Sequence, residues 1–452
     1  MVTSIWQELS VCTCRGINAG DQSKERDLAL AKLILKFCSD VWLKPEVFIY
    51  KTPGINAGQV KTGINNLGCT VAAILLLSKV LLNKLSIKMK KIKSVILFII
   101  CVYNTGYGHN PGLLSYTDSS GLKRYGDTIV KKWDEKKRQR ILKNMEKAMG
   151  KLPQRSGLPP LDIRVTDSVK EDTYTRYTIN FTVAENERLP AYLFIPLQKG
   201  TPQKLPAMLA LHETDPIGKR SLDGQSAKPN RAHAKELAQR GYVVIAPDYP
   251  GFGDLKDYDF DNDRYKSGTM KGIFNHMRCI DLLQGRDDVD AERIGVTGHS
   301  LGGHNAMFIG AFDTRLKVIV SSCGWTQMDY YNAGGEAVRK NGNRLAPWAQ
   351  KVYMPLLRDK YKLDPEKIPF DFDDVISAFA PRAFFSISPL KDNNFDVKGV
   401  REGIAAAARV YRALGVEDKL QVRYPDAGHD FPVESRIEAY RFIDQILEHT
   451  PG

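Results

Sequence analysis

The chain has 452 residues, of which 43% are apolar and 26% are charged, and its formal net charge is +13. This size and composition fit a globular protein with a sizeable core. Residues 1–126 hold 16 Lys and Arg against 7 Asp and Glu, so nine of the thirteen excess positive charges lie there. The rest of the chain is nearly balanced and has no basic stripe, which argues against a nucleic-acid partner.

The cysteines divide in the same way as the charge. Five of the seven lie within the first 101 residues, and only Cys279 and Cys323 follow. Cys12 and Cys14 lack a second Cys or His pair at zinc spacing, so no metal site is expected. Two cysteines do not make a disulfide framework, and we expect Cys279 and Cys323 to be small buried residues.

Residues 1–88 show no sustained helical or strand period. Their apolar run at 71–82 is interrupted by Lys79 and is too short to cross a bilayer, so no stable membrane span is expected. We interpret 1–88 as an unpatterned segment that arises from upstream translation.

The pattern changes at Met89, which opens a basic stretch followed by ten mostly apolar residues, 94–103, and small residues up to Gly108. A basic start, an apolar centre and a small-residue end are typical of a secretory signal peptide. We therefore expect residues 89–108 to direct the protein to the periplasm or the medium. A short buried helix, or lipid attachment at Cys101, are the alternative interpretations.

From residue 109 the chain becomes regular. An N-terminal extension, 109–159, contains a charged amphipathic helix at 127–149, which Gly150 ends. In residues 160–452 strands then alternate with helices, which predicts an α/β domain with a mostly parallel, twisted sheet and helices on both faces. We expect strands at 174–183, 189–196, 207–212, 242–247, 293–297, 316–321, 383–388 and 419–424, and helices at 232–240, 269–283, 303–312, 398–414 and 433–447.

One segment, 324–377, breaks this alternation and is rich in aromatic residues, proline and charge. A long insertion between core strands is typical of a lid or a binding segment. Its aromatic residues are candidate substrate contacts, although each could equally be a packing residue: Trp325, Tyr330, Tyr331 and Trp348.

The most specific motif is Gly298-His299-Ser300-Leu301-Gly302, which fits G-x-S-x-G. It lies between a predicted strand and a predicted helix. There a sharp turn lifts the serine hydroxyl clear of the sheet and places it at a helix N-terminus that favours negative charge. Ser300 is therefore the predicted nucleophile.

A serine nucleophile needs a base and a group that orients the base. His429 lies between the last predicted strand and the last predicted helix, whereas the other histidines lie in helices, near termini or before Ser300. The acid should fall between the serine and the histidine in chain order. Asp392, four residues past a predicted strand, is the first candidate and Asp396 the alternative.

An oxyanion hole requires two backbone N–H donors. One should come from Leu301, directly after the nucleophile. The other should come from the loop after strand 207–212, at Glu213 or Thr214. A nearby acidic run, residues 257–263, has neither register of a calcium-binding loop and is expected to be a solvated loop.

These motifs, with the turn 248–253, the run 380–382 and Gly428-His429, resemble the α/β-hydrolase superfamily over about residues 160–450. The nearest branch is the group of acetyl xylan esterases and dienelactone-hydrolase-like proteins, which borders the prolyl oligopeptidases. The resemblance implies an eight-stranded sheet, an acyl-enzyme mechanism and no cofactor. Dienelactone hydrolases use a cysteine nucleophile, however, and prolyl oligopeptidases carry an N-terminal propeller for which this chain has no room after the signal.

Both departures favour an esterase, and we expect a small-molecule or carbohydrate ester as substrate, with an acetylated carbohydrate as the first candidate. A serine peptidase of the prolyl-oligopeptidase type is the second hypothesis, and a non-catalytic binding protein on the same fold is the third.

Overall fold

The structure is a computed structural model, and it describes residues 115–117, 123–125, 133, 135–198, 200–332, 338–340 and 342–451. The described residues belong to a single unit, 105–452. The expected unpatterned segment 1–88 and signal peptide 89–108 lie outside them. Of the helix expected at 127–149, the structure has α6 at Glu135–Met149, and residues 127–132 and 134 lie outside the described part.

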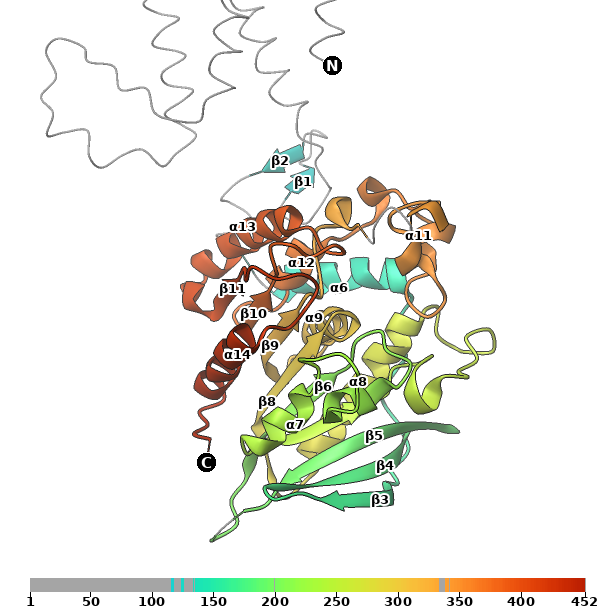
Figure 1. The fold of residues 1–452 in the computed structure, drawn as a ribbon. Coiled ribbons are helices and arrows are strands. Elements are labelled where there is room, and N and C mark those ends of the chain that lie inside the picture. Colours follow the sequence, from blue (N-terminus) through green and yellow to red (C-terminus); the bar gives the residue numbers. More distant parts are fainter. Residues whose placement is uncertain are drawn as a thin grey trace, which may run out of the picture. The chain divides into compact units, whose positions relative to one another are not determined.

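A nine-stranded, mostly parallel sheet forms the centre of this unit, with the strand order β11-β10-β9-β8-β6-β7-β5-β4-β3. Figure 1 shows β3, β4 and β5 at one end of the sheet and β9, β10 and β11 at the other. The strands are β3 Arg164–Lys170, β4 Tyr174–Ala184, β5 Glu187–Pro196, β6 Leu205–Leu211, β7 Val243–Pro247, β8 Val289–His299, β9 Leu316–Ser322, β10 Ala383–Ile387 and β11 Leu420–Arg423. A separate ribbon pairs β1 Ser115–Thr117 with β2 Lys123–Tyr125.

The ninth strand is a correction to the eight strands that the resemblance implied. β3 pairs antiparallel with β4 at the edge of the sheet. Every one of its seven residues is exposed. Because the strand buries neither face, its sequence has no alternation of apolar and polar residues that would reveal it.

Two apolar layers cover the sheet. Strand residues alternate between them: in β6, Leu209 packs in one cluster, while Met208 and Ala210 pack in the other. The first layer holds residues from α6, α8 Gly268–Gln284, α9 Leu301–Phe312, α12 Phe372–Ser377 and α13 Val397–Ala413, and the second from α7 His233–Gln239 and α14 Val433–Ile446. The predicted fold class, a mostly parallel sheet between helical layers, is confirmed.

The insertion 324–377 packs onto the first layer. It contains α11 Leu356–Asp359 and α12, and its residues Leu345, Met354, Leu357 and Phe370 join the core cluster. Residues 333–337 and 341 lie outside the described part. The described residues of the insertion are therefore largely an extension of the core.

Parallel pairing joins β7 to β6, and then β8, β9, β10 and β11 in turn. The carboxyl ends of these six strands consequently share one edge of the sheet, which is where open α/β sheets gather their sites. The loops after β6, β8, β10 and β11 are the segments in which the sequence predicts functional residues.

Candidate active site

The turn from β8 into α9 holds Ser300 in a strained conformation, with φ 54° and ψ −118°. Few non-glycine residues have a positive φ. The N–H of Ser300 donates to the carbonyl of Ser322 at 2.8 Å, and the carbonyl of Ser300 accepts from the N–H of His304 at 2.9 Å. A Cβ on Gly298 would lie 2.2 Å from the carbonyl carbon of Gly302, so the turn closes only because this neighbour is glycine.

The structure brings Ser300, His429 and Asp392 together in one chain of hydrogen bonds. Nε2 of His429 lies 2.8 Å from Oγ of Ser300, and Nδ1 lies 2.9 and 3.0 Å from the two carboxylate oxygens of Asp392. Because a carboxylate only accepts, Nδ1 carries the proton in this assignment and Nε2 is free to accept from the serine hydroxyl. The three loops that supply these residues follow β8, β10 and β11.

The hydrogen bonds of Asp392 and Asp396 distinguish which of them is the triad acid. Oδ1 of Asp392 accepts from the N–H groups of Asn394 and Phe395 at 2.8 and 3.1 Å, and its side chain is 1% exposed. The carboxylate of Asp396 instead accepts from the N–H of Lys398 and caps the N-terminus of α13. Asp392 is therefore the acid that the geometry favours.

The candidate oxyanion donors lie on two neighbouring segments. Leu301 is the first residue of α9, and the first N–H groups of a helix have no partner within the helix. A Cβ on Gly302 would lie 2.0 Å from the carbonyl oxygen of Leu211, so the end of β6 packs directly against this helix start. Glu213 and Thr214 follow that strand end within three residues, and either N–H could be the second donor.

Trp325, one of the aromatic candidates, is too deeply buried for the expected substrate contact, whereas the contact expected of Tyr330 stays a prediction. Trp325 is 1% exposed, and its indole N–H donates to Oγ of Ser386 at 2.9 Å. This is a correction: Trp325 is a core residue, because the insertion folds inward immediately after β9. The hydroxyl of Tyr330 donates to Glu402 on α13 at 2.7 Å, which directs this side chain toward the helix.

Tyr331 and Trp348 contact Phe395, which stacks on His429 and was not predicted from the sequence. The ring of Phe395 stacks on the imidazole of His429 with centroids 5.9 Å apart. Its centroid also lies 5.5 Å from that of Tyr331 and 6.3 Å from that of Trp348. Phe395 lies three residues after Asp392 in the same loop, so its position in the sequence indicated that it is near the site. Its stacking on His429 is a tertiary contact that the sequence does not show.

Arg231, Cys323 and Tyr353 also border the site, and no motif identified them. Arg231 donates to the carboxylate of Asp430, directly after His429, at 2.6 Å. The thiol of Cys323 donates to the carbonyl of Asp430 at 3.1 Å, and burial raises its pKa well above the ordinary value. The hydroxyl of Tyr353 lies 3.5 Å from Oγ1 of Thr214.

Two other features of the described residues bear on ligands. The donor atoms of Cys323, Asp392 and His429 lie within 4.8 Å of one another, a spacing that could hold a metal ion, but Asp392 and His429 already pair with each other. No helix among the described residues is both long and apolar enough to cross a membrane.

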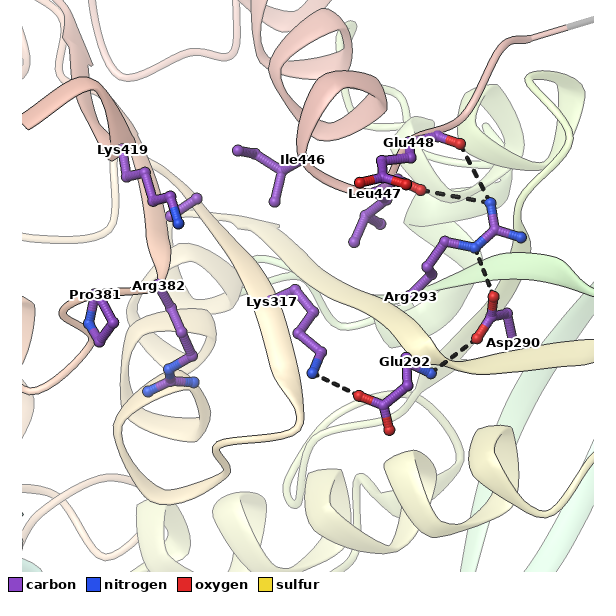
Figure 2. Close-up of a pocket in the computed structure, with 11 residues that line it drawn as sticks. Asp290, Glu292, Arg293, Lys317, Pro381, Arg382, Lys419, Ile446, Leu447 and Glu448 are labelled. Carbon is purple, nitrogen blue, oxygen red and sulfur yellow. Dashed lines mark hydrogen bonds and ion pairs between the residues drawn. The ribbon is translucent and has the colours of Figure 1, made fainter. Parts of the chain in front are cut away.

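A pocket lies at the amino-terminal edge of the sheet, opposite the edge that holds Ser300 (Figure 2). Its volume is about 560 Å³, and it begins where β8, β9 and β10 begin. Four of its charged side chains form two ion pairs: Lys317 with Glu292 at 2.8 Å, and Arg293 with Asp290 at 2.8 Å. The pocket contains none of the residues that the sequence analysis predicts for chemistry.

Comparison with known proteins finds similarity to hydrolases and carbohydrate esterases. A family model described as "Glucuronyl esterase, fungi" matches residues 259–415, a span that includes Ser300 and Asp392 and ends before His429. The chain is 27% identical over 316 residues to "Putative hydrolase YtaP" of Bacillus subtilis, covering 68% of this chain and 98% of that protein. It is 28% identical over 216 residues to the 4-O-methyl-glucuronoyl methylesterase of Hypocrea jecorina, covering 43% of this chain and 44% of that enzyme.

Solved structures share the fold. A glucuronoyl esterase from Solibacter usitatus matches with a TM-score of 0.55 at 20% identity, over 75% of this chain and 98% of that one. A glucuronoyl esterase of carbohydrate esterase family 15 from Caldicellulosiruptor kristjansonii matches with a TM-score of 0.54 at 19% identity, over 77% and 93%. At these identities the likeness is one of fold.

Proposed function

We propose that this chain is a serine esterase of the α/β-hydrolase superfamily, and that it cleaves carboxylic esters of carbohydrates through an acyl-enzyme. The observation that carries the proposal is the continuous hydrogen-bonded chain from Ser300 through His429 to Asp392, at a strained turn on the carboxyl edge of the sheet. The matches to carbohydrate esterases support the reaction class.

In the first half of the proposed reaction, Oγ of Ser300 attacks the carbonyl carbon of the ester while Nε2 of His429 accepts the hydroxyl proton. Negative charge develops on the former carbonyl oxygen. The N–H of Leu301 and that of Glu213 or Thr214 would donate to it. The carbon–oxygen bond to the alcohol then breaks, and the imidazolium gives its proton to the departing oxygen.

In the second half, water takes the place of the alcohol. His429 removes a proton from the water, whose oxygen attacks the acyl carbon bound to Ser300. The acid is released, and the proton returns to Oγ of Ser300. Throughout, the role of Asp392 is to hold Nδ1–H in place and to stabilise the imidazolium that forms in each half.

For the substrate, the glucuronyl esterase family model and the 4-O-methyl-glucuronoyl methylesterase favour an ester in which a uronic acid supplies the acyl group. Our first expectation from the sequence, an acetylated carbohydrate, differs in that acetate is the acyl group. The two can be separated by offering benzyl glucuronoate and acetylated xylan to the same enzyme, with Ser300→Ala as the control. Release of benzyl alcohol by the wild type alone is the expected result, and hydrolysis of only the acetyl ester would contradict the uronoyl assignment.

The peptidase alternative is not favoured by the comparisons. Chromogenic prolyl and alanyl peptides should remain uncleaved under conditions in which the ester is consumed. Cleavage of a peptide at a rate comparable to that of the ester would overturn the proposal.

We also propose that residues 89–108 form a signal peptide and that the protein acts outside the cytoplasm. The basic start at Met89 and the apolar residues 94–103 support this. N-terminal sequencing of the exported protein should place the mature end near His109, and residues 1–88 in the mature chain would contradict the proposal.

A further inference from the structure

The loop that contains the candidate oxyanion donors and the loop that contains His429 are joined by one buried side chain, Arg231. This residue lies two positions before α7, and its side chain is 8% exposed. Its Nη1 donates to Oδ1 of Asp430 at 2.6 Å, while its Nε lies 3.6 Å from Oε1 of Glu213. A planar guanidinium can serve two carboxylates from different atoms in this way, whereas a lysine ammonium presents one point charge.

Both of its partners are carboxylates close to the reacting groups. Glu213 lies on the loop after β6, and its side chain is 4% exposed. One of its oxygens, Oε2, accepts from Ser221 at 3.2 Å, and the other, Oε1, has no hydrogen-bond partner among the described residues. Arg231 is therefore the cation that lies against this buried oxygen of Glu213.

Asp430 is the second carboxylate. Its Oδ2 accepts from Asn230 at 2.7 Å, so residues 230 and 231 together hold both of its oxygens. Burial opposes ionisation, but the hydrogen bonds from Arg231 and Asn230 outweigh it and lower the pKa of the Asp430 carboxyl. Since Asp430 follows His429 directly, this contact also fixes the backbone from which the imidazole projects.

We propose that Arg231 is a positioning residue for the proposed esterase reaction: it fixes the His429 loop through Asp430 and neutralises the Glu213 carboxylate beside the oxyanion donors. The inference rests on the proposed function. An uncompensated carboxylate at Glu213 would repel the charge that develops on the substrate oxygen, and both carboxylates would stabilise the imidazolium of His429. Removing Arg231 would thus lower the maximal rate and shift the pH at which the base loses its proton.

Other charged and titratable groups also face His429. Asp392 contacts its Nδ1 and Cys323 lies behind Asp392, while His299 lies on the β8 side with ring centroids 5.2 Å apart. In the same two loops, the exposed side chains of Lys391 and Asp426 pair with each other at 2.7 Å. Burial, and after it the positive charge of Arg231, holds the pKa of His299 well below its ordinary value, so the field of Arg231 reaches the residue before the nucleophile.

The test uses three variants of the full-length protein. Arg231→Gln removes both the positive charge and the planar guanidinium that contacts two carboxylates. Arg231→Lys keeps the charge but cannot serve both carboxylates. Arg231→Gln with Glu213→Gln removes one uncompensated carboxylate together with the cation and leaves the backbone N–H of residue 213 in place. Arg382→Gln is the matched control, because Arg382 is also largely buried and donates to four carbonyl groups at the opposite edge of the sheet, beside the pocket of Figure 2.

The readouts are kcat/KM for the ester and the rate at which a small fluorophosphonate labels Ser300, both followed from pH 5 to 9. For Arg231→Gln we expect a lower kcat with little change in KM, and an acid limb shifted upward by about one pH unit. Arg231→Lys should lower kcat and leave the acid limb in place. The double variant should recover part of the kcat and part of the shift.

Arg382→Gln should lower thermal stability and leave the acid limb unchanged. If Arg231→Gln does not fold, the contrast between Arg231→Lys and the double variant carries the test. An acid limb in Arg231→Gln or in the double variant that coincides with that of the wild type would overturn the proposal. If the wild type is labelled but hydrolyses no ester, the proposed substrate class fails while the labelling profiles still decide the role of Arg231. A wild type that is not labelled at Ser300 at all overturns both.

Discussion

The two edges of the sheet differ in how their polar groups are used. At the amino edge, the pocket of about 560 Å³ is lined by charged side chains that pair with one another, such as Lys317 with Glu292. At the carboxyl edge, Ser300 has a strained backbone, and its hydroxyl lies in line with His429 and a nearly fully buried Asp392. The pocket lies at the amino edge, whereas the strain and the directed hydrogen bonds lie at the carboxyl edge, which is the one arranged for chemistry.

The physical reason lies in the parallel strands. The loops that follow their carboxyl ends meet at one edge of the sheet. Helix α9 begins there, and its first N–H groups have no partner within the helix. The following predictions test this contrast, beginning with the largest expected effect.

Ser300→Ala should retain the fold and lose nearly all turnover, because no acyl-enzyme can form without Oγ. A remainder of about 10³–10⁴ over the uncatalysed rate is typical of triad enzymes that keep their oxyanion donors. Adding His429→Ala should cost little more, since members of one triad act as a unit. The measurements are kcat for each variant and circular dichroism, and a folded Ser300→Ala protein with near-normal kcat would show that the carboxyl edge is not used as proposed.

Asp392→Asn should lower kcat by about 10⁴, because the amide favours the wrong tautomer of His429. Asp396→Asn is the matched control at the next acidic position of the same loop. It should change kcat little, and since Asn is also a good N-cap, α13 should remain stable. The reverse ranking of the two variants would transfer the role of the acid to Asp396.

Trp325→Ala should destabilise the protein by about 3–5 kcal/mol, the usual cost of truncating a buried aromatic residue. Trp348, which is half-buried near Phe395, offers the comparison: if the insertion contacts substrate, Trp348→Ala should raise KM with a smaller loss of stability. Urea unfolding and KM for the ester distinguish the two. Equal losses of stability with unchanged KM would mean that this part of the insertion is only core.

Acid should weaken the fold between about pH 6.5 and 3. Burial holds the pKa of His233, His276 and His304 at about 3, below the ordinary value of about 6.5 in the unfolded chain. Below pH 6.5 the unfolded state therefore binds protons that the folded state does not, and stability falls with pH by about 1.4 kcal/mol per unit for each histidine. Urea titrations at pH 7.5 and 5.5 measure this, and equal free energies of unfolding at both values would contradict the buried, neutral assignment.

The smallest effect is expected at the amino edge. Lys317→Ala removes an ion pair whose side chains are 38% and 78% exposed, and such pairs contribute about 0–1 kcal/mol. Neither kcat nor KM should change. A substantial fall in kcat/KM would mean that the amino edge takes part in the reaction.

Much of this arrangement could be predicted from sequence because its signals are local. The G-x-S-x-G turn between a strand and a helix predicts the position of Ser300, and chain order with strand ends leads to His429 and Asp392. β3 could not be predicted, because a strand that buries neither face has no amphipathic period. For Trp325, composition marks an aromatic-rich insertion but cannot say which rings turn inward.

The roles of Arg231 and Phe395 depend on contacts over longer distances. Arg231 lies 199 residues before Asp430 in the chain, and only the closing of the sheet brings the two together. Phe395 contacts Tyr331 and Trp348 because the insertion folds back against the loop that contains Asp392. The triad residues have local sequence signals, whereas Arg231 and Phe395 reach the site only through tertiary contacts.

The most direct test of the central claim is to identify the residue that becomes covalently modified. The wild-type protein is treated with a fluorophosphonate, digested, and mapped by mass spectrometry, with loss of ester hydrolysis followed in parallel. One adduct per chain on the peptide that contains Ser300, formed in step with the loss of activity, is the predicted result. An adduct on another residue, or full inactivation with Ser300 unmodified, would contradict the account.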